Sequence, residues 1–184
     1  MEASTVLRDE LDESQLMMWQ LIDRAVETVG ADETVDSGAM RLAFTLRGAS
    51  EAVFGDLHRR LRDAGASNPR TLNALLIMSV RGEMEQGDLV RYGGFSKAAA
   101  STLVDQLVRD GLVVRSGSPR DRRIVLLTLT EAGHDVFRRD FALFNKGEAE
   151  WADGLTSAER AMLVQLLTKL VEVGLGARLP ASLR

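Results

Sequence analysis

Hydrophobic residues recur at intervals of three and four over most of the chain, a spacing typical of amphipathic helices. This spacing predicts one helix at residues 14–29 and a second at residues 37–64. Asn68 is followed by Pro69, which is favoured at the first position of a helix, so a third helix is expected from there to Arg81. The N-terminal part of the chain is therefore expected to be largely helical.

Glycines divide the middle of the chain into shorter elements. The pair Gly93-Gly94 separates a short helix at residues 88–92 from a longer one that begins with Ser96 as N-cap and stops at Gly111. The hydrophobic stripe of the longer helix comprises Ala100, Leu103, Val104 and Leu107. Two short helices joined by a tight glycine turn predict a helix-turn-helix.

The hydrophobic period shortens towards two after Gly111, which is typical of β-strands. Residues 113–115 and 124–129 are expected to form two strands, joined by a charged loop that contains Gly117 and Pro119. A helix-turn-helix followed by such a hairpin has the order of a winged helix-turn-helix, in which the hairpin is the wing.

Helical spacing resumes behind the hairpin. Thr130 is expected to cap a helix that runs towards Trp151, and the capping box formed by Thr156 and Glu159 begins a last helix. The predicted fold is mainly α with a small β-hairpin wing: a winged helix-turn-helix flanked by N- and C-terminal dimerisation helices. Its expected parts are an acidic N-terminal extension with a helix at 1–36, a first dimerisation or linking helix at 37–68, the winged domain at 69–130 and C-terminal dimerisation helices at 131–184.

Composition narrows the class of protein. The 184 residues are 45% hydrophobic, which suffices for one domain with or without an appendage. No apolar run approaches the roughly 18 to 20 residues that span a membrane, so a soluble, cytoplasmic protein is expected. The sequence has no cysteine and two histidines, His58 and His134, which argues against a metal site. Without a nucleophile–base pair, a phosphate loop or metal-ligand spacing, neither an enzyme nor a cofactor is expected.

The formal net charge of -4 is unevenly distributed. Residues 1–36 contain ten acidic and two basic residues, whereas residues 96–123 contain six basic and three acidic ones. Charges more than about 10 Å apart are largely screened at ordinary salt, so a local patch matters more to an anionic partner than the total. The basic residues coincide with the second helix of the motif and with the hairpin, where a phosphate backbone would lie.

The second helix of the motif has a polar face opposite its hydrophobic stripe. Small and polar side chains on that face would let the helix enter the major groove of double-stranded DNA. The face comprises Ala98, Ser101, Thr102, Asp105 and Arg109, flanked by Lys97 and Gln106. The alternative is an ordinary solvated helix face, since every amphipathic helix has a polar side.

The hairpin loop concentrates arginines, because Arg120, Arg122 and Arg123 surround Asp121. A narrow minor groove attracts inserted guanidinium groups, so this loop is expected to contact DNA there. Asp121 would then orient a neighbouring arginine. The alternative is a solvated charged turn, which the helix-turn-helix just before the loop makes the weaker interpretation.

These segments together resemble the MarR family of bacterial regulators. The similarity is carried by DLVRYGGFSKAAASTLVDQL at residues 88–107, GLV at 111–113, PRDRR at 119–123 and LTLTEAG at 127–133. The resemblance implies a homodimer with interleaved N- and C-terminal helices. Each protomer would place a recognition helix in a major groove and a wing in the adjacent minor groove, so a pseudo-palindromic operator is expected.

The resemblance also implies roles for individual residues. Those implied to face bases or phosphates are Ser96, Lys97, Ala98, Ser101 and Thr102. Arg123 would be the minor-groove arginine, with Asp121 as its support. Thr102 and Gln106 stand where relatives often have arginine, so the base contacts of this chain are expected to depart from the common pattern.

The flanking helices carry more apolar surface than a small winged domain can cover. This surface comprises Phe137, Phe141, Phe144, Trp151 and the leucines of the last helix. A homodimer interface is its expected place, and an intramolecular core is the alternative.

Relatives in this family often bind small aromatic or anionic ligands between the helical part and the winged lobe. By that resemblance the candidates to line a cleft for a small-molecule effector are Phe54, His58, Arg59 and Met78. Methionine and phenylalanine at helical spacing more often belong to the core, and that interpretation is favoured here. The absence of cysteine excludes the peroxide-sensing thiol of some relatives.

Two questions stay open at this stage. The winged helix could serve as a protein-interaction module without direct DNA binding, with the acidic extension binding basic partners. The extension itself is expected either to dock on the basic winged lobe and compete with DNA, or to pad the dimer through its helix.

Overall fold

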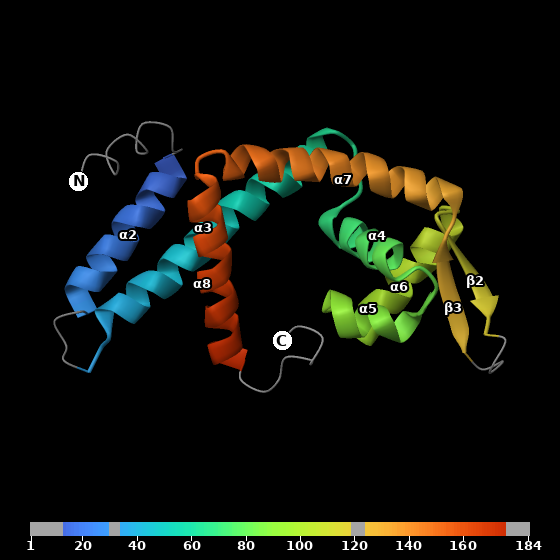
Figure 1. Cartoon of the computed structure of the whole chain (residues 1–184), viewed down its shortest axis with the longest axis horizontal. Coiled ribbons are helices and arrows are strands. Elements are labelled where there is room, and N and C mark those ends of the chain that lie inside the picture. The colour runs from blue at the N-terminus through green and yellow to red at the C-terminus, as the bar shows by residue number, and fades with distance from the viewer. Residues whose placement is uncertain (1–12, 30–33, 119–123, 176–184) are drawn as a thin grey trace.

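The computed structural model describes residues 13–29, 34–118 and 124–175. The chain forms a winged lobe at one end and a long helical arm at the other, with a single helix running along both (Figure 1). Among the described residues, no helix is both long enough and apolar enough to cross a membrane.

The arm begins with two antiparallel helices, α2 (Glu13–Val29) and α3 (Ser37–Asp63). Asp36 caps α3, because its carboxylate accepts a hydrogen bond of 2.9 Å from the backbone nitrogen of Ala39. Ile22 of α2 is buried against α3, which fixes the pair by apolar contact. Both predicted helices are confirmed to within one residue at each end.

The winged lobe contains three helices, α4 (Pro69–Arg81), α5 (Gln86–Gly93) and α6 (Lys97–Arg109). The predicted start of α4 is confirmed, since the Asn68 side chain accepts a hydrogen bond of 3.0 Å from the backbone of Thr71. α5 begins two residues earlier than expected. The reason is that the Asp88 side chain accepts a hydrogen bond of 3.2 Å from the backbone nitrogen of Glu85 and so closes the first turn.

A three-stranded antiparallel sheet completes the lobe, with the order β1-β3-β2. The strands are β1 (Met84–Glu85), β2 (Val113–Gly117) and β3 (Val125–Leu129). The predicted hairpin pairs Val113 with Leu129 and Gly117 with Val125, two residues further than the expected end of its first strand. β1 was not predicted, because two residues are too short for a period, and it exists only by pairing Met84 with Leu127.

One hydrophobic core joins the helices of the lobe to its sheet. It is built from Leu75 and Met78 of α4, Leu89 of α5, Val104 and Leu107 of α6 and Leu127 of β3, each with at most 1% of its surface exposed. The predicted hydrophobic stripe of α6 therefore faces inward. Its polar face is left outside.

Helix α7 (Glu131–Ala152) connects lobe and arm (Figure 1). It packs on both α4 and α3, and two glycines let it come close to Leu57 of α3 and to Leu112, which follows α6. A Cβ atom on Gly133 would lie 2.1 Å from the carbonyl oxygen of Leu112, and one on Gly147 would lie 2.5 Å from a methyl group of Leu57. The predicted cap is confirmed, since Thr130 Oγ1 accepts a hydrogen bond of 3.0 Å from the Gly133 nitrogen.

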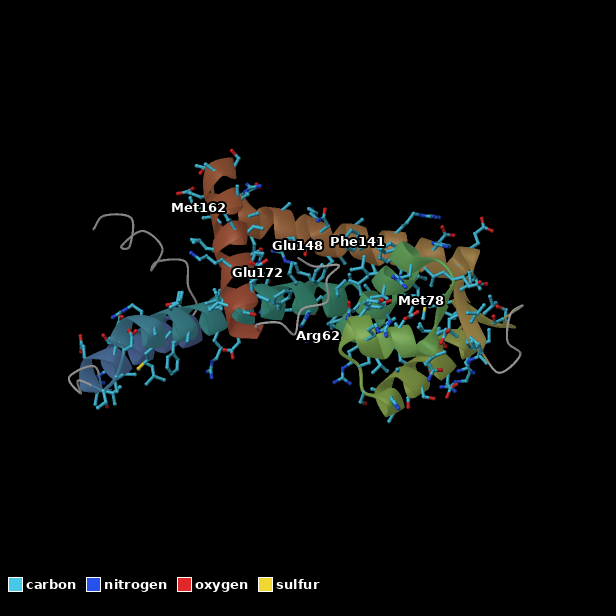
Figure 2. The ribbon with its side chains drawn as sticks, turned by 60° about the horizontal axis from the view of Figure 1, so that its bottom comes forward. Arg62, Met78, Phe141, Glu148, Met162 and Glu172 are labelled. Atoms are coloured by element: carbon cyan, nitrogen blue, oxygen red, sulfur yellow. The ribbon has the colours of Figure 1, made fainter. Side chains whose placement is uncertain are left out.

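The last helix, α8 (Ser157–Leu175), stands clear of the winged lobe, with Met162 near its start and Glu172 near its end (Figure 2). Its predicted capping box is confirmed by two hydrogen bonds. The Glu159 nitrogen donates to Thr156 Oγ1 at 3.3 Å, and the Thr156 nitrogen donates to the Glu159 carboxylate at 2.8 Å. Hydrogen bonds donated to the Glu159 carboxylate by the Thr156 hydroxyl, at 2.7 Å, and by the Thr156 nitrogen hold the pKa of Glu159 below its usual value.

Candidate nucleic-acid interface

Helix α6 presents small and polar side chains to solvent. Ser96 caps it, with its hydroxyl accepting a hydrogen bond of 3.2 Å from the Ala99 nitrogen. Ser96, Ala98 and Thr102 are exposed, whereas Ser101 is half-buried. Because no large side chain covers this face, the backbone of the first two turns can approach a surface closely.

The charged groups of this face differ in how tightly they are held. Lys97 is exposed and has no hydrogen bond or ion pair within the part of the chain that the structure describes. Arg109 donates a hydrogen bond of 2.7 Å to Gln106, whose amide donates one of 2.8 Å to Asp110. Among the described residues, the start of α6 therefore has an unpaired cation, Lys97. The polar side chains at its end are joined by hydrogen bonds.

Asp105 and Arg115 join this face to the wing. Arg115 Nη2 of β2 lies 2.5 Å from Asp105 Oδ1, and the two side chains are 38% and 44% exposed. The sequence analysis predicted Asp105 on the polar face of the helix, but it predicted no partner for Arg115. A helical position and a strand position meet here only because β2 folds back along α6.

The loop with Arg120, Asp121, Arg122 and Arg123 lies outside the described residues. The strands that carry it are described up to Ser118 and from Ile124, where the Ser118 nitrogen donates a hydrogen bond of 3.0 Å to the Ile124 carbonyl oxygen. The roles assigned to the four loop residues stay predictions.

Thr130 fixes the C-terminal end of α6. Its hydroxyl donates a hydrogen bond of 2.7 Å to the carbonyl oxygen of Gly111, and its nitrogen donates one of 3.0 Å to that of Leu112. Gly111 has a φ of 70°, in the left-handed region that glycine tolerates. The same threonine caps α7, so the end of α6 and the start of α7 are held by one residue. The sequence identified only the cap.

A cavity of about 260 Å³ lies between the arm and the winged lobe. α3, α4 and α7 supply its walls, which consist of Phe54, His58, Pro69, Leu72, Asn73, Leu76, Phe141 and Phe144. Of the four candidate ligand residues, Phe54 and His58 are in this wall. Arg59 instead binds Asp56 at 2.6 Å, and Met78 is 1% exposed in the core of the lobe (Figure 2). The favoured core interpretation therefore holds for Met78.

Sequence reasoning missed six of the wall residues, which come from α4 and α7. Helical spacing marks four of them, Leu72, Leu76, Phe141 and Phe144, as inward-facing, whereas Asn73 is exposed. The spacing does not say whether an inward-facing residue meets another side chain or a space.

A buried carboxylate lies on α7 one residue before Phe141 of the cavity wall. Asp140 of α7 is 1% exposed and accepts hydrogen bonds from the Ser67 nitrogen at 2.8 Å and from Arg139 Nε at 2.7 Å. Burial by itself raises the pKa of Asp140, but the hydrogen bonds from Arg139 and Ser67 together hold that pKa below its usual value. Asp140 thereby joins α7 to the loop that precedes α4.

The aromatic residues predicted for the homodimer interface mainly make contacts within the chain. Trp151 Nε1 donates a hydrogen bond of 3.1 Å to Asp56 of α3, the Phe137 and Phe141 rings stack 5.3 Å apart, and Phe141 and Phe144 line the cavity. Burial opposes ionisation of Asp56, yet hydrogen bonds from Arg59, Trp151 and Arg60 leave its pKa lowered. For the phenylalanines, the alternative of an intramolecular core is the better description.

Exposed apolar side chains lie on several helices of the arm. On α3 they are Leu42, Phe44, Leu46 and the cavity-wall residue Phe54, and on α8 they are Met162, Leu163, Val164, Leu166, Leu170, Val171 and Val173. Each of those on α8 is at least 39% exposed. The leucines of the last helix are thus available for a partner, as the sequence suggested.

Fold and site define a winged helix-turn-helix protein in which the second helix of the motif, α6, has an exposed polar face. Residues 68–124 match the model of the MarR family. An uncharacterised helix-turn-helix transcriptional regulator of Bacillus subtilis, YwaE, is 31% identical over 93 residues, which are 50% of this chain and 54% of that protein. The chain thus spans about half the length of this relative. Over residues 68–124, which hold the helix-turn-helix and the wing, the chain is therefore similar to the MarR family.

Solved structures show the same fold. BpsR of Bordetella bronchiseptica is 24% identical, with a TM-score of 0.62 over 71% of this chain and 98% of that one, and its structure describes regulation of DNA binding by 6-hydroxynicotinic acid. A mutant MarR of E. coli in complex with operator DNA is 23% identical, with a TM-score of 0.59 over 71% of this chain and 91% of that one.

Proposed function

We propose that the chain is a homodimeric transcriptional regulator that binds a pseudo-palindromic operator in double-stranded DNA. The observation that carries the proposal is the outer face of α6, which has small side chains, a buried opposite face and a Lys97 that pairs with none of the residues described in the structure. A helix with this division suits a major groove, because the backbone can approach the base edges. The relative solved with operator DNA supports the same use of the fold.

Two groups of residues would make the contacts. Those on and beside α6 are Ser96, Lys97, Ala98, Ser101, Thr102 and Gln106, and those of the wing are Arg120, Arg122 and Arg123, with Asp121 as support. The first group would read the major groove. The second would enter the adjacent minor groove, where the negative potential is strongest.

The exposed apolar side chains of α3 and α8 support a homodimer. A helix with apolar residues on several sides is not stable as a solvated single helix, so a partner surface is required. A second copy supplies one, because the same two helices can exchange across a two-fold axis. Changing Leu166 to Glu is expected to dissociate the dimer in sedimentation experiments, whereas the neighbouring exposed Gln165→Glu is expected to leave it intact.

Selection of bound fragments from the parent genome tests the function. The expected result is an enriched inverted repeat with half-sites separated by about 10 base pairs or a multiple of that spacing. Affinity for it should fall with salt, with a log-log slope of about -0.9 for each phosphate neutralised. Recovery of fragments no different from input, with no salt-dependent binding, would instead favour a protein-interaction module.

The cavity supports regulation by a small molecule. Three phenylalanines in its wall suit a flat aromatic ring, and His58 and Asn73 are polar partners for one substituent. A small aromatic acid, such as the 6-hydroxynicotinic acid named for BpsR, is the first compound to add during a DNA titration. It is expected to weaken DNA binding by the native chain more than by Phe144→Trp, whose larger ring fills the cavity.

A further inference from the structure

The ion pair between Asp105 and Arg115 joins the two elements that the proposed function places in neighbouring grooves. Asp105 lies in the third turn of α6, three residues after Thr102 on the same exposed face. Arg115 lies in the middle of β2, opposite Leu127 of β3. The pair therefore occupies the surface between recognition helix and wing.

The geometry of a duplex dictates what meets that surface. A major groove and the adjacent minor groove are separated by one sugar-phosphate backbone. A protein that inserts a helix into one groove and a hairpin into the other must present the intervening surface to that backbone. On this chain, the intervening surface carries an exposed guanidinium held by a carboxylate at 2.5 Å.

We propose that Arg115 binds a phosphate of the backbone that separates the two grooves, and that Asp105 is its positioning residue. The proposal rests on the DNA-binding function above. A guanidinium has five N–H donors, and the Asp105 contact uses one edge of it, which leaves donors for a phosphate oxygen. The exposed 38% of the Arg115 side chain keeps those donors accessible.

Asp105 orients the Arg115 guanidinium, but its negative charge offsets the positive charge of Arg115. Its carboxylate restricts the rotation of the Arg115 side chain before DNA binds, so less conformational entropy is lost on binding. It also cancels much of the local attraction for anions, in contrast to Lys97, which has no polar partner among the described residues. Arg115 is therefore expected to fix the position of the backbone more than to raise affinity.

The salt dependence of binding to a labelled duplex of mixed sequence tests the phosphate contact without knowledge of the operator. With salt varied between about 50 and 200 mM, Arg115→Ala should make the log-log slope less steep by about 0.9, the amount for one phosphate. Arg115→Lys keeps the charge and should retain the native slope. Arg138→Ala is the matched control, because it removes an exposed arginine paired with Asp135 on α7 and should leave the slope unchanged.

Two substitutions of equal charge test the positioning role. Asp105→Asn removes the charge but keeps an oxygen that accepts a hydrogen bond from Arg115, whereas Asp105→Ala removes both. Asp105→Asn is expected to bind the mixed duplex severalfold more tightly than Asp105→Ala. Thermal unfolding of each variant verifies that the compared proteins are folded.

The outcomes separate this inference from the function on which it rests. If the native chain binds no duplex, both are wrong. If the native chain binds and Arg115→Ala keeps the full slope, the phosphate contact is wrong and the proposed function stands. Equal affinities of Asp105→Asn and Asp105→Ala would show that Asp105 does not position Arg115.

Discussion

At the scale of single residues, the chain distinguishes polar groups that stabilise it from those free to bind. Asp140, Asp56 and Thr130 each satisfy several donors or acceptors between elements far apart in sequence. Lys97, by contrast, has no polar partner among the residues that the structure describes. The first group is expected to affect stability when changed, and the second to affect binding.

Asp140 is expected to make the stability of the fold decrease at acidic pH. Because its folded pKa lies below the usual 3.8, its carboxylate stabilises the fold fully above that pH, and the contribution is lost as pH falls through the folded pKa. Asp140→Asn should therefore lower the free energy of unfolding by about 1 to 3 kcal/mol at neutral pH, with a smaller difference in acid. Urea unfolding at a series of pH values measures this. The exposed Asp135→Asn should show less than about 0.5 kcal/mol at any pH, and an equal loss for both would contradict the special role of Asp140.

Arg123 is the residue on which the wing prediction depends. If it enters the minor groove, Arg123→Ala should weaken operator binding by about 1 to 3 kcal/mol, the value of one good contact. Quantitative binding to the selected operator is the measurement. Unchanged affinity would remove Arg123 from the interface while leaving the role of α6 intact.

At the scale of elements, close helix contacts decide how lobe and arm are joined. Gly133 brings the first turn of α7 against the backbone that follows α6, and Thr130 bonds to the same backbone. α7 continues from there to the cavity (Figure 1). One continuous element therefore connects the cavity wall to the backbone that follows α6.

Glycine-to-alanine substitutions test this junction. Gly133→Ala should destabilise the chain by about 1 to 3 kcal/mol, since the new methyl group would meet a backbone oxygen that cannot move aside. Gly55 of α3 has nothing within 4 Å of its added Cβ, so Gly55→Ala should instead stabilise by about 0.5 to 1 kcal/mol. Denaturant unfolding compares them. Similar effects of both would show that α7 does not need this close contact.

At the scale of the whole molecule, α2 lies against α3 at the end of the arm away from the winged lobe (Figure 1). That position favours the padding role over competition with DNA for the helical part of the extension. The acidic residues 1–12 lie outside the described residues.

Removal of residues 1–33 separates the two roles and spares the Asp36 cap of α3. Padding predicts a lower unfolding temperature, because burial of Ile22 and the ion pair between Asp23 and Arg41 at 2.5 Å are lost. Affinity for DNA should not increase. Tighter binding by the shortened chain would support competition by the acidic extension after all.

Most of the helices, the four caps at Asn68, Ser96, Thr130 and Thr156, and the inward stripe of α6 could be predicted from the sequence, whereas the start of α5 and the Asp36 cap of α3 were missed. Hydrophobic periodicity and helix capping depend only on residues within one or two helical turns. The caps that involve Asn68, Ser96, Thr130 and Glu159 are examples. The exposed face of α6 could be predicted as well, because it lies opposite the hydrophobic stripe, which must be buried.

Tertiary structure alone decided which elements meet. β1 depends on a strand more than forty residues away, Arg115 finds Asp105 only once β2 lies along α6, and Phe141 and Phe144 line a cavity rather than an outer interface. Sequence periodicity specifies that a side chain turns inward, but its neighbour there is set by how whole elements pack. The identity of a contact, a cavity wall or an ion pair is therefore a property of the assembled chain.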